Sequence, residues 1–341
     1  MKTEKYLFIC NTYYHILIAI IKTLLSGIDS SIFISNSWND RSIFDDKKFI
    51  KRLKETNIFR NVICFDIYEE YSNLINIDKK INNIIKYYMI RDSNKKFENI
   101  LNKFDKIYLF NDTTFIGRIV NLQNIKYYLI EDGLDCYKNN RDIIISKNDL
   151  YHFFRKKILG MPDMGCSQNV ISIEVNDKED IFIHDKDIIE LPRTELFSRV
   201  SREDKKSIVN IFIPDLDYNG INNLSLLITQ PLYQDDIICS EDEQINLYQN
   251  IVDKYLKNDN FIIKTHPRER IDYNKIISNN KKILLEMKFP IEVLNFIPDL
   301  KFNKVITISS TSIELINNCE EKITLGWNYI DNLKEGEEHD L

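Results

Sequence analysis

Four short polar clusters in this chain each follow directly after an apolar segment, and they contain the residue types that bind phosphate and move protons. In open α/β sheets, ligands bind at the carboxyl ends of the strands. We therefore expect the four clusters to lie at strand ends and to form the functional site. The clusters are residues 131–133 (EDG), 229–232 (TQPL), 264–268 (KTHPR) and 309–312 (SSTS).

The acidic cluster predicts a general base. Glu131 and Asp132 are adjacent carboxylates. Their mutual repulsion and partial burial at a strand end would both raise a carboxyl pKa and make it a better base. Gly133 would let the backbone turn sharply and let a substrate approach. Asp-Gly is also a common turn dipeptide, so a plain turn is the alternative interpretation.

His266 is the strongest histidine candidate. It follows an apolar segment, precedes Pro267, and lies between Lys264 and Arg268. A cationic loop of this kind suits a phosphate group. The alternative is a surface loop with solvated charges. His15, at the first strand–helix junction, is the second candidate. We expect the remaining histidines to be structural or exposed; they are His152, His184 and His339.

The hydroxyl cluster precedes apolar residues at positions 313, 315 and 316, a pattern typical of a helix start. Hydroxyls and free backbone N–H groups at a helix N-terminus bind anions, assisted by the helix dipole. Ser309, Ser310 and Thr311 are therefore candidates for a phosphate site. Simple helix capping is the alternative, and it needs only one hydroxyl.

Two acidic positions lie outside the clusters. Glu292 opens a predicted short helix, where it would favour the helix dipole or bind ribose hydroxyls. Asp215-Leu216-Asp217 is the only D-x-D string that invites a metal interpretation, and it is a weak pattern. The chain has no G-x-G-x-x-G, Walker or G-x-S-x-G sequence, which disfavours NAD, P-loop and serine-hydrolase chemistry. We predict no metal site and no cofactor.

The composition excludes some classes of protein. The 341 residues carry a formal net charge of −6, whereas nucleic-acid binding usually needs a basic surplus. The six cysteines are scattered without C-x-x-C spacing, so a zinc site is not expected and reduced thiols are. The N-terminus shows no secretory leader, and the apolar run at 16–21 is too short to span a bilayer. We expect a cytoplasmic protein.

Short apolar segments alternate with helical patterns, as in parallel sheets with crossover helices. In the first helix, Ile16, Ile20 and Leu24 share one stripe, with Leu17, Ile21 and Leu25 beside it. Further helical patterns cover 71–104 and 243–256, and 161–165 reads as a loop. The expected strands are residues 6–10, 32–35, 62–66, 106–110, 127–130, 180–184, 187–191, 224–229, 260–264 and 304–308.

Two βα series in tandem predict two Rossmann-like domains. The polar, charged residues 201–206 mark the expected boundary, giving domains 1–200 and 201–341. The first would carry the acidic cluster, and the second would carry the other three polar clusters. The acidic C-terminal residues 332–341 are expected to fray.

The order of the motifs resembles that of bacterial sialyltransferases, in which an acidic E-D-G triplet, an H-P pair and a serine pair follow one another. Here these are residues 131–133, 266–267 and 309–310. The chain is most similar to glycosyltransferase family 52, which sialylates lipooligosaccharide or capsule termini. Residues 10–15 and 229–232 are also similar to that family, and the resemblance runs from about residue 5 to residue 325.

The resemblance implies an α/β, GT-B fold, in which two Rossmann-like domains face each other across a cleft, and an inverting reaction without a metal. It implies that Asp132 is the general base for an acceptor hydroxyl and that Glu131 tunes it. His266 would contact the donor phosphate and stabilise or protonate the leaving CMP. The other donor-binding residues would be Ser309, Ser310, Thr311, Glu292, Arg268 and Gln230.

On the acceptor side, the chain departs from its relatives. Tyr13-Tyr14-His15 follows the first strand, where a threonine-proline start is common in the family. This region would face the acceptor. The candidates for acceptor or cleft contacts are Glu131, Gly133, Tyr13 and His15.

The expected function is transfer of sialic acid from CMP-sialic acid to a terminal galactose of a cell-surface glycan, through an α-2,3 bond. Three alternatives stay open: another donor, such as a cytidine-linked sugar or polyol phosphate; a UDP-sugar 2-epimerase-like isomerase; and a nucleotide-binding module without catalysis. We expect no nucleic-acid partner. A homodimer and peripheral contact with the inner face of the cell membrane are compatible with this expectation.

Overall fold

The computed structural model describes residues 4–36, 42–72, 83–133, 137, 164–179, 181–183, 185–214, 216, 223–266, 268–285 and 288–331. The chain divides into two compact units, residues 1–204 and 205–341. Each unit contains a parallel sheet. The prediction of an α/β chain with two parallel sheets is confirmed.

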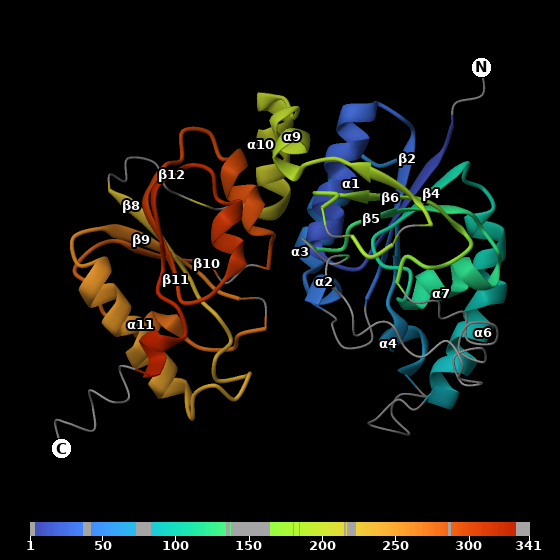
Figure 1. Cartoon of the computed structure of the whole chain (residues 1–341). Coiled ribbons are helices and arrows are strands. Elements are labelled where there is room, and N and C mark those ends of the chain that lie inside the picture. Colours follow the sequence, from blue (N-terminus) through green and yellow to red (C-terminus); the bar gives the residue numbers. More distant parts are fainter. Residues whose placement is uncertain are drawn as a thin grey trace. The chain divides into compact units, whose positions relative to one another are not determined.

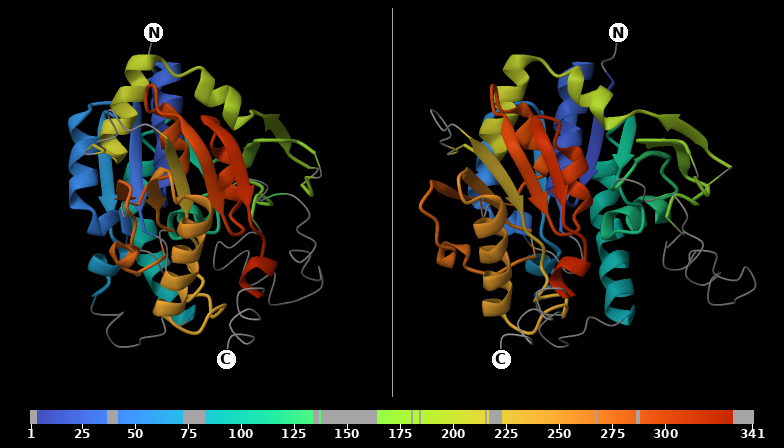
Figure 2. Two further views of the ribbon diagram at one scale, coloured as in Figure 1. Left: turned by 90° about the vertical axis from the view of Figure 1, so that its left-hand side faces the viewer. Right: turned by 60° about the vertical axis from the view of Figure 1, so that its left-hand side comes forward.

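The first unit is built on a seven-stranded sheet in the order β3-β2-β1-β4-β5-β6-β7. Figure 2 shows β6 and β7, in yellow-green, at one edge of this sheet. The strands are β1 (Tyr6–Cys10), β2 (Ser30–Ser35), β3 (Asn61–Phe65), β4 (Lys106–Leu109), β5 (Tyr127–Ile130), β6 (Val170–Val175) and β7 (Asp187–Glu190). The helices are α1 (Tyr13–Ser26), α2 (Ser42–Asp45), α3 (Lys47–Glu55), α4 (Ile67–Glu70), α6 (Asn83–Leu101), α7 (Phe115–Leu122) and α9 (Arg193–Ser198).

Helices cover both faces of this sheet (Figure 1). α1 lies on one face, and its stripe of Ile16 and Ile20 is fully buried. Leu25, which was expected on the same apolar face, is 39% exposed, so the prediction is wrong at that position. α6 and α7 cover the other face, where Phe97 and Ile116 join a cluster with sheet residues. In a sheet covered on both faces the inner strands are shielded from solvent on both sides, and β1 and β2 are buried at every position.

The second unit has a five-stranded parallel sheet in the order β10-β9-β8-β11-β12. α11 packs on one face through Tyr248 and Ile251, which belong to the same apolar cluster as Leu227 and Ile263. The strands are β8 (Leu224–Ile228), β9 (Asn260–Lys264), β10 (Lys282–Leu285), β11 (Phe302–Thr307) and β12 (Cys319–Thr324). The helices are α10 (Arg202–Phe212), which begins at the end of the first unit, α11 (Glu241–Tyr255) and the 3-10 helices η2 (Tyr273–Lys275), η3 (Ile291–Phe296) and η4 (Thr311–Leu315).

Most predicted strands are confirmed to within about two residues at each end, the usual uncertainty of element bounds. Three strands were missed. β6 lies where the sequence looks irregular, β10 is only four residues long, and β12 reads CEEKIT, which is too polar for a buried strand. β12 is an edge strand, and charged side chains are typical of edges. The expected strand at 180–184 is wrong for its described residues, which form an isolated bridge at Ile181; positions 180 and 184 lie outside the described residues.

No helix among the described residues is long and apolar enough to cross a membrane.

We predict that Gly117→Ala destabilises the first unit. In open space, alanine would favour a helix by about 1 kcal/mol over glycine. At Gly117, however, a Cβ atom would lie 2.7 Å from the backbone of Asp112, which cannot rotate away. Overpacking of this kind costs about 1–3 kcal/mol, so we expect a lower free energy of unfolding, measured by urea denaturation followed by circular dichroism.

Gly27→Asn is the matched control. Gly27 has a φ of +61° and no atom within 4 Å of an added Cβ. Asparagine tolerates this left-handed conformation, so the control should unfold nearly as wild type does. A Gly117→Ala protein as stable as wild type would show that the backbone at Asp112 yields easily.

Candidate active site

Three neighbouring strands of the first unit end at one cluster of polar side chains. β1, β4 and β5 are adjacent in the sheet. The Asp132 carboxylate follows β5, and its Oδ2 accepts a hydrogen bond of 2.7 Å from Asn111 Nδ2, just after β4. Its Oδ1 is bonded to Nε2 of His15, in the first turn of the helix that follows β1. The sheet thus joins residues that are more than 100 positions apart in the sequence.

His15 is held in one orientation. Its Nδ1 accepts a hydrogen bond of 3.2 Å from the backbone N–H of Asn11, which leaves Nε2 as the ring nitrogen that donates to Asp132. Its backbone N–H is bonded to the capping Oγ1 of Thr12 at 3.1 Å. The ring stacks on Phe110 with the centroids 4.3 Å apart. Because only 1% of His15 is exposed, it cannot reach a substrate directly.

Asp132 keeps an open side. Its side chain is 29% exposed, against 1% for its partner His15. Burial would raise the pKa of Asp132, but the charge interaction with His15 and the hydrogen bonds from His15 and Asn111 outweigh burial, so the pKa lies below its ordinary value. The expectation of a raised pKa is therefore wrong. The carboxylate is ionised at neutral pH and can accept a proton.

Glu131 points away from Asp132. Its Oε2 accepts a hydrogen bond of 2.6 Å from the backbone N–H of Asn176, just after β6. Asn176 Oδ1 in turn accepts the backbone N–H of Arg193 at 2.9 Å. Glu131 is 3% exposed. Glu131 therefore anchors the segment that carries Asp132 to the end of β6. The proposed repulsion between the two carboxylates does not set the pKa of Asp132.

The other two acceptor candidates differ in accessibility. Tyr13 is 8% exposed and packs edge-on against Phe49, with centroids 4.9 Å apart, so it lies in the core of the unit. Gly133 has no positive φ, and a Cβ there would meet no atom within 4 Å. The expectation that the turn needs glycine is therefore wrong, although the space beside Gly133 is open.

In the second unit, the polar clusters also gather at neighbouring strand ends. β9, β8 and β11 are adjacent, and they are followed by His266, Gln230 and Ser309. Gln230 Oε1 accepts the backbone N–H of Ser309 at 2.8 Å, which ties the end of β8 to the end of β11. Gln230, His266 and Ser309 are each half-buried, so each keeps surface that a ligand could contact.

His266 is a neutral imidazole at neutral pH. Burial first, and then the positive charges of Arg268 and Lys264, lower its pKa to about 4. Its Nδ1 accepts the backbone N–H of Arg268 at 3.2 Å, so the neutral ring carries its proton on Nε2. A negatively charged group bound beside it would favour the protonated form. The protonation state of His266 therefore depends on which ligand occupies the loop.

The two cations beside His266 are less free than the sequence suggests. Arg268 forms a bidentate ion pair with Asp235 at 2.6 and 2.9 Å, so its guanidinium is already engaged. Lys264 is 4% exposed, and its Nζ donates to the Thr265 carbonyl at 2.9 Å. Burial lowers the pKa of Lys264 to about 8. A ligand phosphate would have to displace Asp235 to use Arg268.

The hydroxyl cluster lies at a shorter helix than expected. η4 is a 3-10 helix of five residues, and Ser310 caps it by accepting the Ser312 backbone N–H at 3.3 Å. The expected contribution of a full helix dipole is therefore wrong, because so few peptide dipoles are aligned. Ser309 is half-buried and Thr311 is exposed. Glu292 lies in η3 and is 6% exposed, so most of its surface is already covered.

Three residues that form hydrogen bonds to candidate site residues were not predicted from the sequence. Asn111 follows a predicted strand directly, so the rule that identified the four clusters could have found it. Gln244 and Glu269 had no such signal, because one lies inside a polar helix and the other in a charged loop. Both make hydrogen bonds to the candidate loops of the second unit.

Several sequence candidates lie outside the described residues. These are Asp215, Asp217, Pro267, His152, His184 and His339. Among the residues that the structure does describe, no group of three or more His, Cys, Asp or Glu side chains is placed to hold a metal ion.

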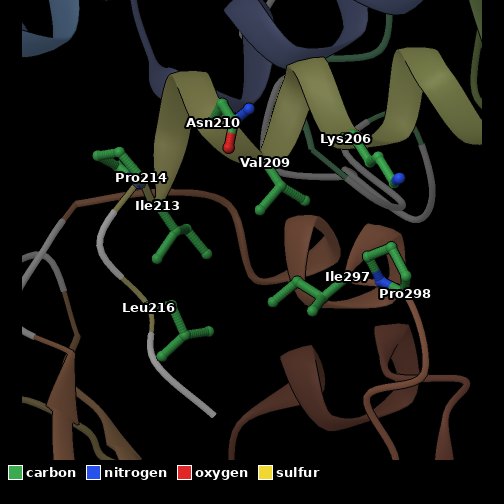
Figure 3. A pocket seen from close by; sticks show the side chains of 8 residues that line it. All are labelled: Lys206, Val209, Asn210, Ile213, Pro214, Leu216, Ile297 and Pro298. Carbon is green, nitrogen blue, oxygen red and sulfur yellow. The ribbon is translucent and has the colours of Figure 1, made fainter. Parts of the chain in front are cut away.

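A pocket of about 290 Å³ lies in the second unit and contains none of the candidate residues. Figure 3 shows Val209 of α10 and Ile213, just after this helix, facing the pocket, with Ile297 across from them and Lys206 farther along the helix. The other residues that line it are Asn210, Pro214, Leu216 and Pro298.

We predict that His266 titrates with a pKa of about 4, well below the usual 6.5, for the reasons given above. Two-dimensional NMR of the imidazole resonances from pH 3.5 to 8 measures this value. Since the unfolded state binds this proton near pH 6.5, His266 contributes stability above that pH, and the contribution is lost as the pH falls from 6.5 towards 4. A pKa near 6.5 would mean that the ring is solvated.

The sequence pattern of glycosyltransferase family 52 matches residues 49–325. A protein from Haemophilus influenzae (strain ATCC 51907 / DSM 11121 / KW20 / Rd), described as an uncharacterized protein, is 31% identical over 196 residues. That alignment covers 56% of this chain and 59% of the relative, so the chain spans less than two thirds of the relative's length.

Two solved structures are similar over most of the chain. The UDP-GlcNAc 2-epimerase from Methanocaldococcus jannaschii has a TM-score of 0.47 at 14% identity, covering 97% of this chain and 92% of that one. TcCGT1 in complex with UDP has a TM-score of 0.47 at 9% identity, covering 89% and 77%. With TM-scores below 0.5, neither similarity carries a conclusion about activity.

The family pattern, by contrast, extends over most of the chain and includes Asp132, His266 and Ser309. The protein belongs to glycosyltransferase family 52.

Proposed function

We propose that this glycosyltransferase moves sialic acid from CMP-sialic acid to a terminal galactose of a cell-surface glycan, with inversion and through an α-2,3 bond. The observation that carries the proposal is the Asp132 carboxylate, which is ionised, hydrogen-bonded at both oxygens and still 29% exposed. The order of the E-D-G, H-P and serine motifs supports a CMP-linked sialyl donor.

On the acceptor side, Asp132 acts as the general base. It takes the proton from the galactose hydroxyl while that oxygen forms a bond to the anomeric carbon of the sialyl group. The bond from that carbon to the phosphate oxygen breaks, and CMP leaves with the electron pair. His15 and Asn111 hold both carboxylate oxygens in place, and such positioning lowers the barrier because no reorganisation is needed during reaction.

On the donor side, His266 and Ser309 receive the phosphate, with Ser310, Thr311 and Gln230 nearby. CMP carries a single phosphate, so fewer positive charges are needed than for a diphosphate leaving group. The neutral His266 would gain a proton when the anionic phosphate binds, since the phosphate offsets the charges of Arg268 and Lys264. The protonated ring would then stabilise the negative charge that develops on CMP. Glu292 would bind the ribose. Arg268 would contact the phosphate once its ion pair with Asp235 is broken.

Asp132→Asn tests the base. The amide is close in size to the carboxylate and can still accept a hydrogen bond from His15, but it cannot accept a proton. We expect the rate of transfer to fall by about 10²–10⁴-fold, the usual span for a general base, with CMP affinity unchanged in calorimetry. Asp253→Asn, an exposed aspartate on α11, is the control and should keep full activity. Transfer at the wild-type rate in Asp132→Asn would remove Asp132 from the mechanism.

The donor and reaction type are tested with CMP-sialic acid and fluorescent lactose in the presence of EDTA. We expect a sialylated product and released CMP, at a rate that EDTA does not change. A sialidase selective for α-2,3 bonds should cleave the product. CMP release without product would mean that the donor is right and the acceptor is wrong.

Two results of the same assay would contradict the proposal. If neither product nor CMP forms, the donor is wrong, and conversion of UDP-N-acetylglucosamine without an acceptor would then favour the isomerase. If EDTA abolishes activity and Mg²⁺ or Mn²⁺ restores it, a metal takes part, and Asp215 and Asp217 become candidates for its ligands.

A further inference from the structure

We propose that Gln244 and Glu269 form a polar hub, which positions the three loops that the donor phosphate would contact. The hub consists of these two side chains together with the hydroxyls of Tyr248 and Tyr273. This proposal rests on the proposed function for the identity of the donor. The contacts within the hub do not depend on that identity. We infer that Gln244 and Glu269 are positioning residues, which act through the loops that they hold.

Glu269 connects the end of β8 to the end of β9. Its Oε2 accepts the backbone N–H of His266 at 2.5 Å and is also bonded to Thr229 Oγ1. Its Oε1 accepts Tyr273 OH at 2.6 Å and Gln244 Nε2 at 2.7 Å. Four donors on one carboxylate fix the backbone of His266 relative to Thr229. The orientation of the imidazole therefore depends on a side chain three positions further along the chain.

Gln244 connects the same carboxylate to the loop after β8. It is fully buried in α11, and its Nε2 donates to the Gln230 carbonyl at 2.9 Å. Its Oε1 accepts the backbone N–H of Tyr233 at 2.8 Å. Gln230 in turn holds the backbone N–H of Ser309 with its own Oε1. One buried amide thus helps to fix the loops that carry Gln230, His266 and Ser309.

The two tyrosines complete the hub. Tyr248 OH accepts the backbone N–H of Gln230 at 2.7 Å, and Tyr273 OH lies 2.6 Å from Gln244 Nε2. Burial raises the pKa of both phenols, so both keep their protons. Their rings pack edge to face with centroids 5.5 Å apart. The phenols therefore give the polar side chains a rigid apolar support.

A purely structural role does not account for where these bonds go. Stability alone would favour apolar side chains, because polar groups pay a desolvation cost on burial. The hub's bonds end on loops after β8 and β9 and, through Gln230, after β11. These are the loops that carry the candidate donor residues. Displacement of a binding group by about 1 Å can cost about a hundredfold in rate, which gives such a network a functional value.

Gln244→Leu, with Gln249→Leu as the matched control, tests the hub. Both glutamines lie on α11 and bond to backbone groups outside the helix. Gln249 bonds to Ile277, which carries no candidate residue. Tyr273→Phe is a milder variant that loses only the hydroxyl, and it keeps the test valid if Gln244→Leu folds poorly.

Amide hydrogen exchange, followed by NMR, measures how well the loop amides are protected. Calorimetry with CMP measures the affinity of the site. We expect protection of the His266 and Ser309 amides to fall at least about tenfold in Gln244→Leu, since their hydrogen bonds depend on the hub. CMP affinity should fall by about tenfold or more, within the range for misplaced binding groups. Tyr273→Phe should show smaller changes of the same kind, and Gln249→Leu should show none.

The possible results separate the two proposals. Unchanged exchange at His266 and Ser309 in folded Gln244→Leu and Tyr273→Phe would overturn the hub. Lost protection with unchanged CMP affinity would overturn its role in donor binding. If wild type binds no CMP, the proposed donor is wrong, and the exchange result then decides by itself whether the hub positions the loops.

Discussion

Parallel pairing of neighbouring strands is the constraint on which both candidate sites depend. In a parallel sheet, adjacent strands end at the same edge, so residues that follow them become neighbours whatever their distance in the sequence. β1, β4 and β5 bring together His15, Asn111 and Asp132 in this way. β9, β8 and β11 do the same for His266, Gln230 and Ser309. A change in the register of one strand would separate these groups.

Burial then decides which of these polar groups can react. A buried polar atom without a partner costs about 1–3 kcal/mol, which favours hydrogen-bonded side chains with a fixed position in the interior. His15 is bonded at both ring nitrogens, and Gln244 at both ends of its amide. Asp132 and His266 keep exposed surface. The accessible groups are therefore placed to contact substrate, and the buried groups are placed to orient them.

Burial, hydrogen bonds and nearby charges together set the pKa values of these two groups. Asp132 stays ionised because its bonds to His15 and Asn111 outweigh the effect of burial on its pKa. His266 stays neutral because burial and two nearby cations act in the same direction. An ionised carboxylate and a neutral imidazole are also the ordinary states at neutral pH, and the lowered pKa values extend both states to lower pH. Each unit thus holds one group whose usual charge state the fold stabilises.

The sequence alone was sufficient to predict two parallel α/β units, from composition and strand periodicity. The placement of the polar clusters was sufficient to predict Asp132, His266 and Ser309 at strand ends. These features could be predicted because they depend on residues close together in the sequence. Only the tertiary structure decided which clusters meet and how each side chain is bonded. It paired Asp132 with His15 instead of Glu131, engaged Arg268 with Asp235, and placed Gln244 and Glu269 among the candidate loops. Those contacts join segments up to 117 residues apart, and no local pattern of residues encodes them.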